Sequence, residues 1–198
     1  MGNYNNLNIL IIGGSGQVGL EIQEKQLGVG HLDTALTLFY FGYLYSEQEL
    51  YEKAESFYLR ALAIEEKELG AEHIDTAQTL YDLGSLYLDQ KLYEKAEQFL
   101  SRALVIHEKE LGPDHPELAI ILSFVAQSFV ERGLYEQAEP SFSRALDINE
   151  KAFGPEHPET GTSLNNLGML YLDLTLYEKA KPLLFRSLAI REKALGLE

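Results

Sequence analysis

The chain has 198 residues, contains no cysteine and carries a formal net charge of −15 at pH 7. A surplus of acid on this scale argues against binding to nucleic-acid phosphates or to anionic membranes, because both require a basic face. Without thiols, disulfides and thiolate metal sites are excluded, which is consistent with a reducing, cytoplasmic location. No apolar run approaches the roughly 18 residues of a membrane-spanning helix. We therefore expect neither a nucleic-acid nor a membrane partner.

The first 18 residues differ from everything that follows. Gly14, Gly16 and Gly19 form a GxGxxG pattern after an apolar run, which is similar to the dinucleotide-binding turn of short-chain-dehydrogenase-like reductases. That fold needs a second strand and an acidic residue about 20 positions later, whereas helical sequence follows here at once. We therefore expect residues 1–18 to be an atypical Gly-rich leader, either poorly ordered or an altered start of a longer repeat array, and we keep a nucleotide-binding enzyme fragment as a minor alternative.

From residue 19 onward the chain repeats itself. Four copies of one pattern each carry a histidine, at intervals of 42 residues (73 − 31 = 42), and these are His31, His73, His115 and His157. A fixed period in this range predicts a repeat architecture. Residues 19–28 match residues 61–70 at the same offset, which predicts a partial helix before the first full repeat. The predicted repeat domain 19–198 thus consists of that partial helix and repeats at about 32–70, 74–112, 116–154 and 158–196.

Each repeat is predicted to be a pair of helices. In the second copy Leu80, Leu83, Gly84 and Tyr87 follow the spacing of one helix face. A second helix is predicted from about Tyr93.

The ends of these helices carry their own signals. Asp75 and Thr76 are candidate N-caps for the first helix of this copy, while Gly112 and Pro113 end the second. The turn between the helices has glycine only at Gly133, and the other copies carry Glu49, Lys91 and Thr175 there.

Small and large side chains recur in phase. The small residues predict close helix packing, and they are Gly42, Gly84, Ala126 and Gly168 in the first helix and Ala54, Ala96, Ala138 and Ala180 in the second. The large ones are interpreted as core aromatics, and they are Tyr45, Tyr87, Phe129 and Tyr171, with Tyr51, Tyr93, Tyr135 and Tyr177.

The pattern resembles the tetratricopeptide repeat, which in the second copy is carried by Leu80, Leu83-Gly84, Tyr87, Ala96, Leu100 and Ala103. The 42-residue period is similar to the kinesin-light-chain type of this repeat. The resemblance implies an all-α fold, a right-handed superhelical solenoid of helix-turn-helix repeats. It also implies a protein–protein interaction scaffold that binds a peptide segment of a partner in a concave groove, with no enzymatic activity and no cofactor.

In such solenoids the first helix of each pair lines the groove. The resemblance maps the peptide-binding positions onto Phe39, Tyr40, Tyr43, Glu47, Tyr81, Asp82, Ser85, Asp89, Ser123, Phe124, Gln127, Glu131, Asn165, Asn166, Met169 and Asp173. These rows are aromatic in the first copy, polar in the fourth and edged by acids in every copy. They contain no Lys or Arg, so an acidic partner tail is disfavoured, and a basic or aromatic peptide is expected. The alternative interpretation is a solvated acidic face.

Other recurring residues are given structural roles. The loop histidines of successive repeats should lie on the order of 10 Å apart, which is too far for a shared metal ion, so no metal site is predicted. Arg60, Arg102, Arg144 and Arg186 recur on the second helix and predict ion pairs with a neighbouring helix, while His107 is expected to be exposed. No polar capping element follows the last helix. We therefore expect a longer array or, as the alternative function, a structural module that forms homo-oligomers through its uncapped solenoid ends.

Overall fold

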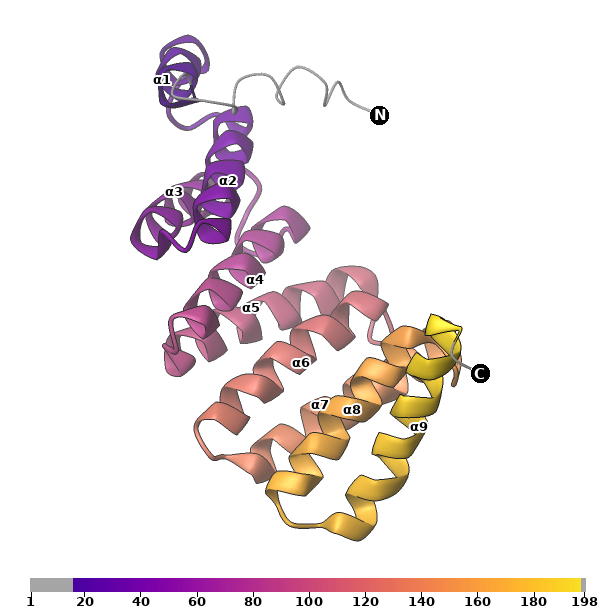
Figure 1. The fold of residues 1–198 in the computed structure, drawn as a ribbon. Helices are drawn as coiled ribbons and strands as arrows, with labels where there is room; N and C mark the ends of the chain where they lie inside the picture. Colours follow the sequence, from indigo (N-terminus) through magenta and orange to yellow (C-terminus); the bar gives the residue numbers. More distant parts are fainter. Residues whose placement is uncertain (1–15, 197–198) are drawn as a thin grey trace. The chain divides into compact units, whose positions relative to one another are not determined.

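The computed structural model describes residues 16–196, and within that range it contains helices, turns and loops but no strand. The predicted all-α class is confirmed. The helices of this range, shown in Figure 1, are α1 Gly16–Leu27, α2 Leu32–Glu47, α3 Tyr51–Glu68, α4 Ile74–Asp89, α5 Tyr93–Leu111, α6 Pro116–Glu131, α7 Tyr135–Phe153, α8 Pro158–Asp173 and α9 Tyr177–Leu195.

The chain forms two compact units, of which the first ends at Gln90 and the second begins at Lys91. In the first unit α1 packs on α2, α2 on α3 and α3 on α4, and α2 also meets α4. In the second unit each helix from α5 to α9 packs on the next, and α6 also meets α8. Within each unit, the first helices of two successive repeats are therefore neighbours.

The small residues explain how closely the paired helices approach. A Cβ added at Gly42 would lie 2.6 Å from Cδ1 of the buried Tyr58 ring, and one at Gly168 would lie 2.7 Å from Cδ2 of Leu184. The four alanines of the second helices are fully buried. Close packing at these positions, predicted from their size, is confirmed at Gly42 and Gly168.

The aromatic positions are less uniform than predicted. Tyr87 and Tyr171 are buried, and their hydroxyls donate to Glu55 Oε1 at 2.6 Å and Glu139 Oε1 at 2.7 Å on the preceding second helix. The prediction that the other aromatic row is core was wrong for Tyr177, which is 62% exposed at the start of α9.

Each first helix begins with the same capping interaction. His73 is the N-cap of α4, and the Asp75 N–H donates to its Nδ1 at 3.1 Å. The prediction of Asp75 and Thr76 as N-caps was therefore wrong. Thr76 lies inside the helix and donates from Oγ1 to the carbonyl of Gly70, 2.9 Å away. The same capping bond recurs at the other three loop histidines, which are His31, His115 and His157.

The turns inside the helix pairs require a left-handed backbone. Gly133 has φ 73°, and the residues that replace glycine in the other copies adopt the same conformation, with φ 58° at Glu49, 59° at Lys91 and 58° at Thr175. This region is unfavourable for residues that carry a Cβ, and most of all for β-branched ones. The copies without glycine thus keep the same turn conformation, and their backbone is strained there.

The start of the described range contains the predicted partial helix. It is α1, which begins at Gly16, three residues before the position expected from the repeat match. Gly14 and Ser15 of the GxGxxG pattern lie outside the described residues. The division into a leader 1–18 and a repeat domain 19–198 remains a prediction.

Candidate functional site

The predicted groove residues are accessible in both units, and none of them is buried. In the first unit Tyr43 is 51% exposed on α2, and Glu47 and Asp89 are also exposed. Phe39 is half-buried because its ring packs edge-on against Tyr58 of α3, with centroids 5.6 Å apart.

The first unit brings the predicted residues of two repeats together around Tyr58. Burial raises the pKa of the Tyr58 phenol, and the nearby Asp82 of α4, with Tyr43 and Glu47 of α2, adds to the rise. Asp82 is itself affected, since burial raises its pKa to about 6 although the Gln78 amide donates to its Oδ2 at 2.9 Å. α2 and α4 therefore share one aromatic and acidic surface.

A second group of acids lies where these two helices end. Burial raises the pKa of Asp89, and the charges of Glu47 and Glu49 add to this effect. These carboxylates belong to successive repeats and repel one another. Negative charge is therefore concentrated at this end of α2 and α4.

In the second unit several of the predicted residues make hydrogen bonds within the protein. Glu131 accepts from the Gln127 amide at 2.7 Å and from the Tyr93 hydroxyl at 3.2 Å, while Ser123 Oγ donates to the carbonyl of Ala119 at 2.7 Å. Asn165 and Asn166 are half-buried on α8, and Met169 is exposed there. This surface is more polar than that of α2 and α4. The remaining predicted residues here are the half-buried Phe124 and the exposed Asp173.

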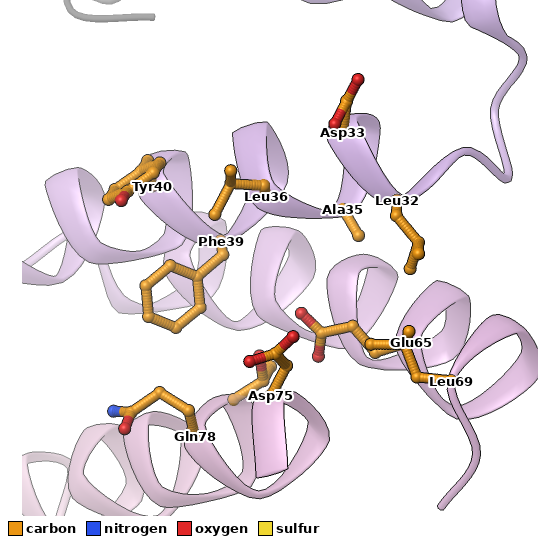
Figure 2. A pocket seen from close by; sticks show the side chains of 11 residues that line it. Leu32, Asp33, Ala35, Leu36, Phe39, Tyr40, Glu65, Leu69, Asp75 and Gln78 are labelled. Atoms are coloured by element: carbon orange, nitrogen blue, oxygen red, sulfur yellow. The ribbon is translucent and has the colours of Figure 1, made fainter. Parts of the chain in front are cut away.

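A pocket of about 340 Å³ opens in the first unit, and the sequence interpretation did not include it. Figure 2 shows side chains from α2, α3 and α4 around it, with Glu65 of α3 directed toward its interior. The pocket is lined by Leu32, Asp33, Ala35, Leu36, Phe39, Tyr40, Glu65, Leu69, Asp75, Gln78 and Thr79. It adjoins the predicted groove, since Phe39 and Tyr40 belong to both.

Glu65 is the unusual member of this set. It is only 7% exposed, and burial raises the pKa of its carboxyl to about 7. The neighbouring Thr79 hydroxyl opposes this rise, and the charges of Asp75, Asp82 and Glu66 add to it. Its Oε2 and the Oγ1 of Thr79 are buried without a hydrogen-bond partner among the described residues. Helical spacing from the core residues Tyr58, Ala61 and Leu62 could have identified Glu65 as inward-facing.

The repeated arginines have the predicted structural role in three copies. Arg60 pairs with Glu24, Arg144 with Glu108 at 2.8 Å, and Arg186 with Glu150 at 2.6 Å. Each pair joins a second helix to the preceding second helix. These side chains therefore support the scaffold.

The prediction that His107 is exposed was wrong. His107 is 3% exposed on α5, with Nδ1 at 2.8 Å from the carbonyl of Ala103 and Nε2 at 3.9 Å from Glu117 Oε2. Between residues 16 and 196 no group of three His, Asp or Glu side chains is arranged to hold a metal ion. Over the same range no helix has the length and hydropathy needed to cross a bilayer.

The family model described as Tetratricopeptide repeat matches the chain in four overlapping stretches, which are residues 19–67, 42–104, 75–148 and 117–193. These stretches together span nearly the whole chain. The comparison with curated proteins gives no match.

Solved structures resemble the chain over most of its length. One contains the nearly identical TPR-like repeats of a Podosopora anserina protein described as a kinesin light chain, with a TM-score of 0.79, 21% identity and coverage of 96% of this chain and 93% of that chain. BtubC (BKLC) from P. vanneervenii has a TM-score of 0.82 at 20% identity, covering 97% and 76% respectively. Aspartyl phosphate phosphatase F from Bacillus subtilis has a TM-score of 0.71 at 23% identity, covering 96% of this chain and 48% of that chain. These likenesses show the fold, and the predicted solenoid of kinesin-light-chain-like repeats is confirmed.

Proposed function

We propose that this chain, which belongs to the tetratricopeptide repeat family, binds an extended segment of a partner protein along the first helices of its repeats. The family supplies a scaffold fold typical of protein–protein interaction, and it prescribes no reaction. The proposed module has no enzymatic role and needs no cofactor. Because the chain lacks cysteine, we place the module in the cytoplasm.

One observation carries this proposal. The side chains predicted to line the groove all remain accessible, and in the first unit they form a shared aromatic and acidic surface on α2 and α4. Aromatic side chains give a large contact area at low entropic cost and are enriched among residues that dominate binding energy. The groove positions contain no Lys or Arg, so the partner segment should carry positive charge.

The second unit contributes a different chemistry to the same proposal. Asn165 and Asn166 on α8 have side-chain amides that both donate and accept hydrogen bonds. Such groups can hold the backbone of an extended peptide whatever its sequence. We therefore assign charge selection to the first unit and backbone capture to α8.

Substitution in the groove tests the proposal with a basic peptide captured by the full chain. We expect Tyr40→Ala to weaken that binding by about tenfold, which is the loss typical of an aromatic contact at the centre of an interface. Asn166→Ala should weaken it less. The matched control is Tyr177→Ala, which removes an exposed tyrosine outside the groove rows and should leave binding unchanged. Equal binding by all three variants would contradict the proposal.

A second candidate function, self-association, is favoured by the surface of α9. Phe185 is 62% exposed and Leu188 is 49% exposed, whereas the positions equivalent to Phe185 in the two preceding repeats are Ser101 and Ser143. An apolar surface of this kind can associate with another copy. Light scattering distinguishes this function, because a mass of 22.3 kDa at all concentrations would reject it. A dimer that dissociates on Phe185→Ser would support it.

A further inference from the structure

In the pocket of the first unit, the buried carboxylate of Glu65 points into the pocket interior. Glu65 lies on α3, between the apolar start of α2 and the start of α4 (Figure 2), and its Oε2 has no hydrogen-bond partner among the described residues. A buried group with unused hydrogen-bonding capacity requires an explanation. Its position in a pocket beside the predicted groove suits a ligand that supplies donors.

The sister repeats show that this arrangement is particular to Glu65. The positions equivalent to Glu65 include Gln23, whose Oε1 accepts from Thr37 Oγ1 at 2.8 Å, and the buried His107 and Asn149. Asn149 Nδ2 donates to Ser163 Oγ at 2.9 Å, and Ser163 is the equivalent of Thr79. His107 Nδ1 lies within hydrogen-bond distance of the Ala103 carbonyl. The equivalent side chains of these other copies thus make hydrogen bonds within the protein, whereas Glu65 Oε2 makes none among the described residues.

We propose that this pocket receives the side chain of a lysine from the partner segment, with its ammonium group on Glu65. The inference rests on the proposed function, because the lysine belongs to the protein that the groove binds. It adds a specific anchoring position and a residue type for the partner.

The walls of the pocket fit a lysine along its whole length. Leu32, Leu36 and Leu69 provide an apolar surface for the alkyl stem, which lysine buries readily while its charge is held elsewhere. At the inner end, Glu65 Oε2 and the neighbouring Thr79 Oγ1 are oxygens without a hydrogen-bond partner within the described range, and both can accept from an ammonium group.

Charge also favours lysine in this pocket. The carboxylate of Asp75 adds negative charge to the lining, which has no basic residue. An ammonium group has three donors that point in separate directions, so it suits dispersed acceptors better than the planar guanidinium fork of arginine.

The affinity for lysine should depend on pH, because Glu65 must be ionised to bind an ammonium group. The acids whose charges act on it are Glu66 of α3, and Asp75 and Asp82 of α4, while the Asp33 carboxylate of α2 points away from it in Figure 2. Since the carboxyl ionises near pH 7 in the free protein, an ammonium ligand must shift it to the charged form. The ionised fraction rises about tenfold between pH 6 and pH 8, and the affinity for lysine should rise by the same factor.

The test titrates Nα-acetyl-lysine N-methylamide into the ¹⁵N-labelled full chain and follows the amide resonances by NMR. We expect saturable shifts at Leu69 and Thr79, an affinity that rises about tenfold from pH 6 to pH 8, and binding at least tenfold weaker for the norleucine analogue. Glu65→Gln and Glu65→Asn should both lose binding and its pH dependence. Glu65→Asn installs the residue of a sister repeat, so it guards against a folding defect.

The control variant is Glu52→Gln, which removes one exposed acid from the same helix and should bind like the parent protein. Equal binding of the lysine and norleucine probes, unchanged binding by Glu65→Gln, or tighter binding of the arginine analogue would overturn the assignment. The outcome is separable from the proposed function, because peptides captured by the groove without a lysine preference would refute only the pocket. A lysine probe that binds while no peptide is captured would instead refute the groove.

Discussion

At the scale of single residues, this chain places unfavourable groups at two kinds of position, the buried carboxyl of Glu65 and the left-handed turn residues. Each costs stability in isolation, because a charge loses its hydration on burial and a Cβ crowds the left-handed backbone. The two differ in consequence. The strain of the turn residues lies in the backbone itself, whereas Glu65 faces a pocket in which a cation could compensate for its burial.

The buried carboxyl should make stability depend on pH. The pKa of Glu65 rises from an ordinary value of 4.5 to about 7 in the folded protein, so its contribution is fully present below about pH 4.5 and is lost as the pH rises through 7. Glu65→Gln should therefore gain stability relative to the parent protein between pH 5 and pH 8, by up to about 3 kcal/mol. Urea denaturation at both pH values measures this difference. A constant offset between the two proteins at both pH values would show that Glu65 does not titrate in this range.

The turn at Thr175 should be improved by glycine. Thr175 is exposed, is β-branched and has φ 58°, so Thr175→Gly removes strain without removing packing. We expect a gain of about 0.5–1 kcal/mol in the free energy of unfolding. Gly133→Ala is the matched reverse change, because no atom lies within 4 Å of the added Cβ, and it should lose about 1 kcal/mol. Thermal denaturation compares the two, and a loss in the Thr175 variant would contradict the backbone explanation.

At the scale of helices, the same connection between a second helix and the next first helix occurs four times. A glycine with positive φ ends each second helix, its carbonyl accepts from the N–H of the loop histidine, and that histidine caps the next first helix. This connection explains why the histidines recur at a fixed interval. The sequence pattern showed the interval but not the role, because histidine is an uncommon N-cap.

Helix pairing should be sensitive to one methyl group at Gly42. The added Cβ would lie 2.6 Å from the Tyr58 ring, which is buried and packed against Phe39, so the helices would have to separate. Gly42→Ala should therefore destabilise the protein by about 1–3 kcal/mol. Gly30→Ala is the control, because its nearest neighbour is Lys67 Nζ at 3.9 Å, and it should change stability by less than about 0.5 kcal/mol. Equal effects of the two substitutions would refute the packing role of Gly42.

At the scale of the whole molecule, periodicity was sufficient to predict the fold. A pattern repeated four times identifies helices, turns and small contact residues together, and any one of these signals alone would be weak. The environment of Glu65 could not be predicted in the same way. It depends on whether Thr79 on another helix is close enough to satisfy it, and the sister residues Asn149 and Ser163 do form that bond. The burial of His107 likewise depends on neighbouring helices and is not visible in the repeat pattern.

The excess negative charge is also a property of the whole molecule. It is distributed along the acidic rows of the first helices, while the recurring arginines are engaged in ion pairs between second helices. The positive charge of these arginines is thus neutralised within the protein, and the acidic groups of the groove can interact with a partner. Electrostatic attraction of this kind weakens as salt screens it.

The most direct test is a peptide-array screen of the purified full chain against basic-aromatic, acidic and neutral peptides at low and high salt. The proposed function predicts capture of basic peptides, strongest for those that contain lysine, and a marked loss of capture at high salt. Capture of acidic peptides as tightly as basic ones, or capture of no class at all, would contradict the proposal that this chain is an interaction module with an acidic groove.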